Sequence, residues 1–231
     1  MQRESITVQP LTICQRILRG VVSTTLESTV AVLEGLVVYY YNDEKKVSTR
    51  YLSISSFVVG VFIVFVSIAV GNLSDRSKAK FRRKPFILIF APLYAAGLFF
   101  RFGAFVNNSS APLYYGIALC VQIVGRSGMS ITNDAWNMEL ANEEVDRGKL
   151  YATLTAMGVL GILLGLGLTA VPLVYSGVLL SVLVLVFNIA NVIAIPEGTP
   201  MDKRCFIPTI TNICSVMWNS QYRGKITSIR I

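Results

Sequence analysis

Between Leu150 and Pro196 the chain runs for 47 residues without a charged side chain. As a single α-helix rising 1.5 Å per residue, this run would be about 70 Å long, more than twice the ~30 Å core of a bilayer. The run therefore predicts two membrane spans joined by a turn, which Pro172 and the pair Ser176-Gly177 mark. We expect these two spans over residues 150–171 and 176–195.

The composition of the whole chain indicates the same class of protein. Apolar residues make up 53% and charged residues 15%, and the mean hydropathy is +0.59, outside the ordinary range of soluble proteins. The predicted fold class is an all-α integral membrane protein with six transmembrane helices. Four further spans are expected over residues 20–41, 51–70, 85–106 and 111–133, between a polar segment 1–19 and a polar tail 197–231.

The Lys and Arg residues divide unevenly between alternate loops. With the amino end in the cytoplasm, sixteen of them lie on the cytoplasmic side, and only Lys45, Lys46 and Arg50 lie outside. Because basic residues concentrate in cytoplasmic loops, both termini are expected there, in the plasma membrane or an internal membrane. The basic excess is thus a topology signal, and no nucleic-acid partner is expected.

The residue types that support many kinds of catalysis are missing from the chain. There is no histidine, and the four cysteines show no paired or metal-binding spacing. Zinc sites, histidine bases and Cys-His nucleophiles are therefore unsupported. We predict that the protein is not an enzyme and that it has no metal, no cofactor and no disulfide framework.

Polar side chains interrupt two of the expected spans. Glu27 and Glu34 lie two turns apart in span 20–41 and would share a helix face. A charged side chain at that depth costs about 2.5–3.5 kcal/mol on insertion scales, so it should face the protein interior and mark a solute or ion path. The alternative is a structural glutamate, protonated or paired. In span 111–133 a second polar face recurs every three to four residues, at Gln122, Arg126, Ser130 and Asn133.

Glu27 and Arg126 each lie about seven residues from the cytoplasmic end of their spans. Their equal depth leads to the hypothesis that they pair or jointly bind a polar solute. Arg101 is interpreted differently, because it lies near the outer end of its span and its long side chain can snorkel to the interface.

Small residues recur along span 150–171. A face of this kind lets two helices pack closely, which is favoured here over ligand contact. The residues concerned are Gly158, Gly161, Gly165 and Gly167.

A short basic stretch, Gly71 to Phe86, follows the second expected span and contains six Lys or Arg residues after Asp75. Gly71 would let two helices approach closely, and Asp75 could cap a helix or pair with an arginine. The alternative is that the basic residues merely hold the loop in the cytoplasm.

The spacing of this stretch resembles the loop between the second and third spans of the major facilitator superfamily, in its glycoside-pentoside-hexuronide cation symporter branch. Residues 134–149 resemble the loop between spans four and five, with Arg147-Gly148 eight residues after Glu139. The resemblance covers about residues 20–196 and matches the amino-terminal half of that fold. The residues that carry it in the first loop are Gly71, Leu73, Asp75, Arg76, Arg82 and Arg83.

The resemblance implies two three-helix inverted repeats and secondary active transport of a small polar solute by alternating access, with a sugar as the first candidate. It implies that Glu139 and Arg147 form a latch and that Glu27 lies near a substrate-binding acid. It also implies a gating loop made by Gly71, Asp75, Arg76, Arg82 and Arg83. The branch's two sodium-binding aspartates are replaced here by Ile63 and Ser67, so sodium coupling by those ligands is unsupported.

Because the resemblance covers one half of a carrier, we expect the lipid bilayer, a solute, and a second half-carrier or a second copy of the chain as partners. Residues 218–223 resemble the lead-in to a seventh span. The alternative function is that of a transport-incompetent, truncated or regulatory subunit that associates with a full carrier.

Overall fold

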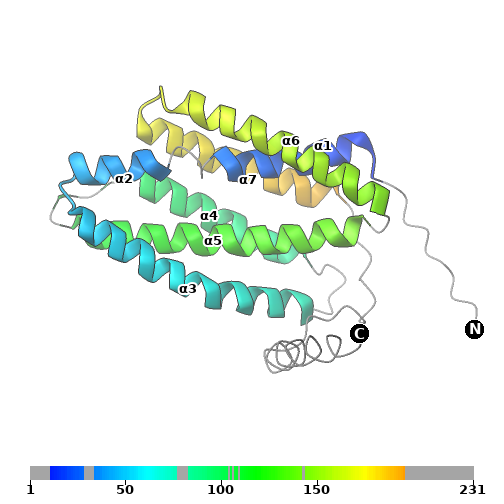
Figure 1. The fold of residues 1–231 in the computed structure, drawn as a ribbon, viewed down its shortest axis with the longest axis horizontal. Coiled ribbons are helices and arrows are strands. Elements are labelled where there is room, and N and C mark those ends of the chain that lie inside the picture. The colour runs from blue at the N-terminus through cyan, green and yellow to red at the C-terminus, as the bar shows by residue number, and fades with distance from the viewer. Residues whose placement is uncertain are drawn as a thin grey trace, which may run out of the picture. The chain divides into compact units, whose positions relative to one another are not determined.

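The computed structural model describes residues 11–28, 34–76, 83–103, 105, 107–108, 110–141 and 144–195, without the side chains of Arg76 and Glu144. The expected gating residue Arg82 and the tail 197–231 lie outside these residues. Within them the chain forms seven α-helices: α1 (Ile13–Ser28), α2 (Glu34–Asp43), α3 (Thr49–Arg76), α4 (Lys84–Gly103), α5 (Ala111–Leu140), α6 (Glu144–Leu168) and α7 (Leu173–Ala194) (Figure 1).

Among the described residues, four helices are long and apolar enough to cross a membrane, namely α3, α4, α6 and α7. The protein is therefore a multi-pass integral membrane protein, and the regular secondary structure of its described residues is all helical. The first expected span falls on α1 and α2, which flank residues 29–33 outside the described part. The fourth expected span falls on α5, whose polar side chains lower its hydropathy.

Several helices continue past the expected spans. Helix α3 ends at Arg76 rather than Val70, and α5 ends at Leu140 rather than Asn133. The loop predicted over residues 134–149 is thus wrong, because α6 already begins at Glu144. Hydropathy locates the stretch that tolerates lipid, whereas backbone hydrogen bonding continues the helix into polar sequence.

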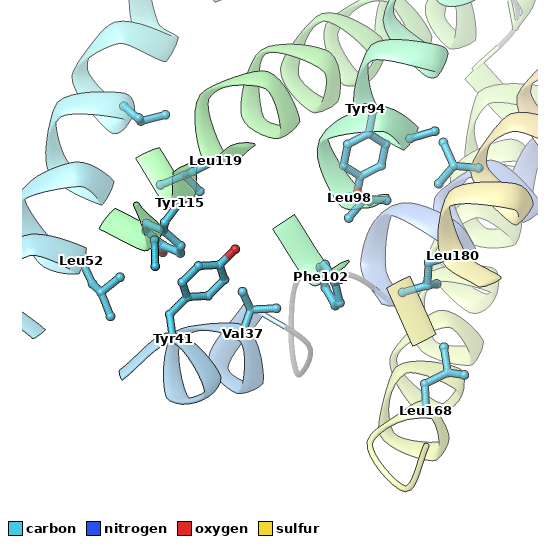
Figure 2. Close-up of a cluster of buried hydrophobic side chains, with 14 of the residues drawn as sticks. Val37, Tyr41, Leu52, Tyr94, Leu98, Phe102, Tyr115, Leu119, Leu168 and Leu180 are labelled. Atoms are coloured by element: carbon cyan, nitrogen blue, oxygen red, sulfur yellow. The ribbon is translucent and has the colours of Figure 1, made fainter. Parts of the chain in front are cut away.

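Helix α4 packs against both α5 and α7, while α1 packs against α6 and α7. Helix α3 packs along α5, as Figure 1 also shows. Figure 2 shows the main apolar core, where Tyr41 of α2 meets Tyr115 of α5. The two rings lie 4.8 Å apart, and the Tyr41 hydroxyl donates a 3.1 Å hydrogen bond to the carbonyl of Arg101. The short helix α2 is thereby fixed against α4 and α5.

The predicted small-residue face of α6 is confirmed at two of its glycines. A Cβ atom at Gly165 would lie 2.7 Å from the carbonyl oxygen of Ser28, and one at Gly161 would collide with Thr24. The backbone of α1 therefore lies directly on α6. Gly167 meets no atom within 4 Å, so it is not part of this contact.

Gly71 also meets no atom within 4 Å of an added Cβ. The prediction that it allows close helix packing is therefore wrong for the described residues. Gly71 lies near the end of α3, where the buried side chains are Val70 and Ser74, one on each side of it along the helix.

Candidate functional site

Arg101 of α4 is buried in the interior, with only 2% of its surface exposed. Its guanidinium donates hydrogen bonds of 2.7 Å to the Gln122 side-chain oxygen and 3.4 Å to the Tyr115 hydroxyl. The interpretation that Arg101 snorkels to the interface is therefore wrong. The buried guanidinium of Arg101 finds its hydrogen-bond acceptors on α5, so its side chain stays inside the helix bundle.

A carboxylate on α2 lies between two guanidinium groups. The Glu34 Oε1 atom is 3.9 Å from Arg101 Nη1 on α4 and 3.9 Å from Arg126 Nη1 on α5. These separations are too long for direct hydrogen bonds, so the attraction acts through space. The Glu34 and Arg126 side chains are about one third exposed, at 32% and 34%, whereas Arg101 lies behind them. We refer to Glu34, Arg101 and Arg126 as the three-charge cluster.

The structure thus brings together Glu34, Gln122 and Arg126 from the predicted path. It does not form the hypothesised ion pair between Glu27 and Arg126, because Glu34 takes that place. Glu27 instead lies on the α6 side of α1, where its Cγ atom would be 3.4 Å from a Cβ added at Gly158. Among the described residues, Glu27 makes no ion pair.

A cavity of about 60 Å³ lies between α1, α5 and α6. The predicted path residues Ser130 and Asn133 both line it. The Asn133 side chain is 5% exposed, and neither its oxygen nor its nitrogen finds a hydrogen-bond partner in the described part of the chain. The cavity is thus a polar site with room for a few waters. Its other polar lining residues are Arg19, Ser23, Asp134 and Asn137.

Arg19 is a site residue that sequence reasoning used only for topology. It is 2% exposed, and its Nε and Nη2 atoms donate to Asn137 Oδ1 at 2.6 Å and to the Asn133 carbonyl at 2.9 Å. Its guanidinium carbon lies 4.1 Å from the centroid of the Trp136 ring. Asn133, Trp136 and Asn137 recur at helical spacing, a pattern that could have indicated a binding site for a buried cationic side chain.

A second ionic cluster joins the end of α3 to the end of α5. Arg83 Nη2 lies 2.8 Å from both Asp75 Oδ1 and Glu139 Oε1, and Arg83 also donates to the Ser74 hydroxyl. Arg83 is 5% exposed and Glu139 is 4% exposed, whereas half of the Asp75 side chain is accessible. We refer to Asp75, Arg83 and Glu139 as the Arg83 cluster.

Other residues of the predicted gate and latch lie elsewhere. Arg147 donates to the carbonyl of Ala141 at 3.3 and 3.2 Å instead of pairing with Glu139. Gly71 and Asp75 lie in the last two turns of α3 and not in a loop. Within the described residues, no group of three His, Cys, Asp or Glu side chains could hold a metal ion.

Residues 20–177, more than half of the chain, match the family described as MFS/sugar transport protein. None of the curated proteins matches the chain.

Proposed function

The chain belongs to the MFS/sugar transport protein family, and on that premise we propose that it is a secondary transporter or the amino-terminal half of one. In this proposal it moves a small polar solute across the bilayer by alternating access. Members of this family are membrane transporters and not enzymes. The family description makes neutral sugars the first solutes to test.

The three-charge cluster is the observation that carries this proposal. The Glu34 Oε1 atom lies 3.9 Å from one guanidinium nitrogen of Arg101 and 3.9 Å from one of Arg126. Ionisable groups at such depth are costly, and they face the interior of a bundle where a solute or ion passes. Partial exposure of Glu34 and Arg126 leaves both available to a solute, whereas Arg101 holds the cluster in position from behind.

The helix contacts support six spans in two inverted three-helix repeats. The first repeat would contain α1 with α2, then α3 and α4, and the second repeat would contain α5, α6 and α7. Exchanging the repeats replaces α1 by α5, α3 by α6 and α4 by α7. The α1–α6 contact then corresponds to the α3–α5 contact, and the α4–α5 contact corresponds to the α1–α7 contact. All four contacts are observed. The contact between α4 and α7 is its own counterpart, as inverted repeats require.

The Arg83 cluster would serve as the gate. Arg83 and Glu139 are buried, but Asp75 is half exposed and can exchange partners at small cost. A carrier that alternates between two states needs an element that is stable in either arrangement. The positive-inside distribution of Lys and Arg supports a cytoplasmic location for this cluster.

The test is uptake of a panel of labelled small polar solutes, hexoses among them, into proteoliposomes that contain the purified chain. Saturable uptake is expected, and Glu34→Gln or Arg126→Gln should reduce it at least tenfold. Glu44→Gln and Arg50→Gln alter exposed charges outside the three-charge cluster and should leave uptake unchanged. Absence of uptake for every solute tested, with binding to a separate full carrier, would replace this proposal with the regulatory-subunit alternative.

A further inference from the structure

One layer of side chains lies a single turn from the cavity between α1, α5 and α6, on the side away from the amino end of α1. Ser23, Ser130 and Leu154 line the cavity, one from each helix. Residues four positions along a helix share a face. One turn further are therefore Glu27 on α1, Arg126 on α5 and Gly158 on α6, which we call the inner layer.

The contacts of Gly158 place Glu27 in this layer. A Cβ at Gly158 would lie 3.4 Å from Glu27 Cγ and 3.6 Å from Ser23 Oγ. Both α1 side chains thus point toward the same strip of α6. Since Gly158 lacks a side chain, the Glu27 side chain can lie close to the backbone of α6 at this position.

The two charges of the inner layer are incompletely balanced by the protein. Glu27 makes no ion pair within the described part of the chain. Arg126 shares the single carboxylate of Glu34 with Arg101, so two guanidinium groups face one carboxylate. The inner layer therefore presents a negative charge on α1 and a surplus positive charge on α5.

The charges that line the cavity itself do not offset this imbalance. Arg19 is held by Asn133, Asn137 and Trp136. Asp134 accepts a hydrogen bond from Ser130 and lies close enough to Arg19 to interact with it. These two groups contribute one charge of each sign and are already engaged with neighbouring residues.

We propose, on the basis of the transport function above, that the solute is a small zwitterion whose cationic group binds Glu27 and whose anionic group binds Arg126. An ammonium group supplies the counter-charge that Glu27 lacks, and a carboxylate neutralises the surplus guanidinium. A neutral sugar would leave both charges uncompensated in a low-dielectric setting.

The test uses four ligands of nearly equal shape on the purified full chain. Alanine carries both charges, alaninamide carries only the ammonium, lactate carries only the carboxylate, and lactamide carries neither. Glucose is the neutral-sugar comparison. Equilibrium binding should be at least tenfold tighter for alanine than for each of the other four, since a lost charged contact is worth about a factor of ten or more.

Two variants assign the charges to their residues. Glu27→Gln should abolish the preference for alanine over lactate and keep the preference for alanine over alaninamide. Arg126→Gln should give the opposite pattern. A merely structural role would weaken the binding of all ligands equally, which would overturn the assignment. If either variant fails to fold, the five-ligand series on the unaltered chain still decides the proposal.

Uptake measurements separate this inference from the proposed function. Transport of glucose without binding or transport of alanine would overturn the zwitterion inference and leave the transporter intact. Transport of alanine that lactate and alaninamide do not inhibit is the expected result. Failure of every solute to bind or to be taken up would overturn both proposals.

Discussion

Arg101 on α4 donates a 2.7 Å hydrogen bond to the side chain of Gln122 on α5, and both residues are at least 98% buried. This contact ties two helices together at the same level as the three-charge cluster. It also fixes the guanidinium that faces Glu34. The strength of the contact and its role in positioning can be measured separately.

Removing Arg101 should destabilise the protein strongly. Arg101→Leu leaves Gln122 without its donor and Glu34 with one cation fewer, and breaking a buried polar pair of this kind costs about 3–5 kcal/mol. Thermal unfolding in detergent should show a clearly lower Tm. Arg50→Leu removes an exposed arginine and should shift Tm little. Equal shifts in the two variants would mean that Arg101 is held at the surface.

Glycine substitutions in α6 should have opposite effects at two neighbouring sites. Gly161→Ala places a methyl group against the Thr24 carbonyl, and overpacking of this kind costs about 1–3 kcal/mol. Gly167→Ala meets open space, and Ala is favoured over Gly in a helix by up to about 1 kcal/mol. The Tm should fall in the first variant and stay or rise in the second. A fall in both would contradict the close packing of α1 on α6.

The two carboxylates of the Arg83 cluster should contribute unequally to stability. The Glu139 side chain is 6% exposed and that of Asp75 is 51% exposed. Glu139→Gln should therefore cost about 3–5 kcal/mol, whereas Asp75→Asn should cost less than about 1 kcal/mol. Denaturant unfolding of the two variants in one detergent tests this order. The reverse order would mean that Asp75 is the principal partner of Arg83.

Arg19 should stabilise the contact between α1 and α5. Arg19→Gln removes the hydrogen bonds to Asn137 and to the Asn133 carbonyl and the stacking on Trp136. The expected loss is about 2–4 kcal/mol, since charged hydrogen bonds are worth about 1.5–3 kcal/mol and the cation–π contact adds further stability. Arg16→Gln is the matched control.

Arg16 lies near the start of α1, and among the described residues its side chain donates a hydrogen bond to the nearby Leu11 carbonyl, so its loss should be nearly neutral. Tryptophan fluorescence of the folded protein should change with Arg19→Gln and not with Arg16→Gln. Unchanged fluorescence spectra and unchanged unfolding in both variants would show that the contacts of Arg19 with α5 do not stabilise the protein.

The membrane class and the number of apolar stretches follow from the pattern of charged residues, because lipid cannot solvate them. The long uncharged run from Leu150 to Pro196 had to turn back, and it does so between α6 and α7. The polar face of α5 was also predictable from its spacing, since Gln122, Arg126 and Asn133 all lie on the interior or at a site. Helix ends were less predictable, because polar residues can continue a helix beyond the lipid.

The sequence alone therefore determined the class of fold and which side of each polar helix points to the interior. Only the tertiary structure decided the partners. Glu34 rather than Glu27 lies beside Arg126, Arg101 turns inward, and Arg19 stacks on Trp136. Periodicity along one helix fixes the direction of a side chain, but the partner depends on how distant helices pack, which glycines such as Gly161 set through backbone contact.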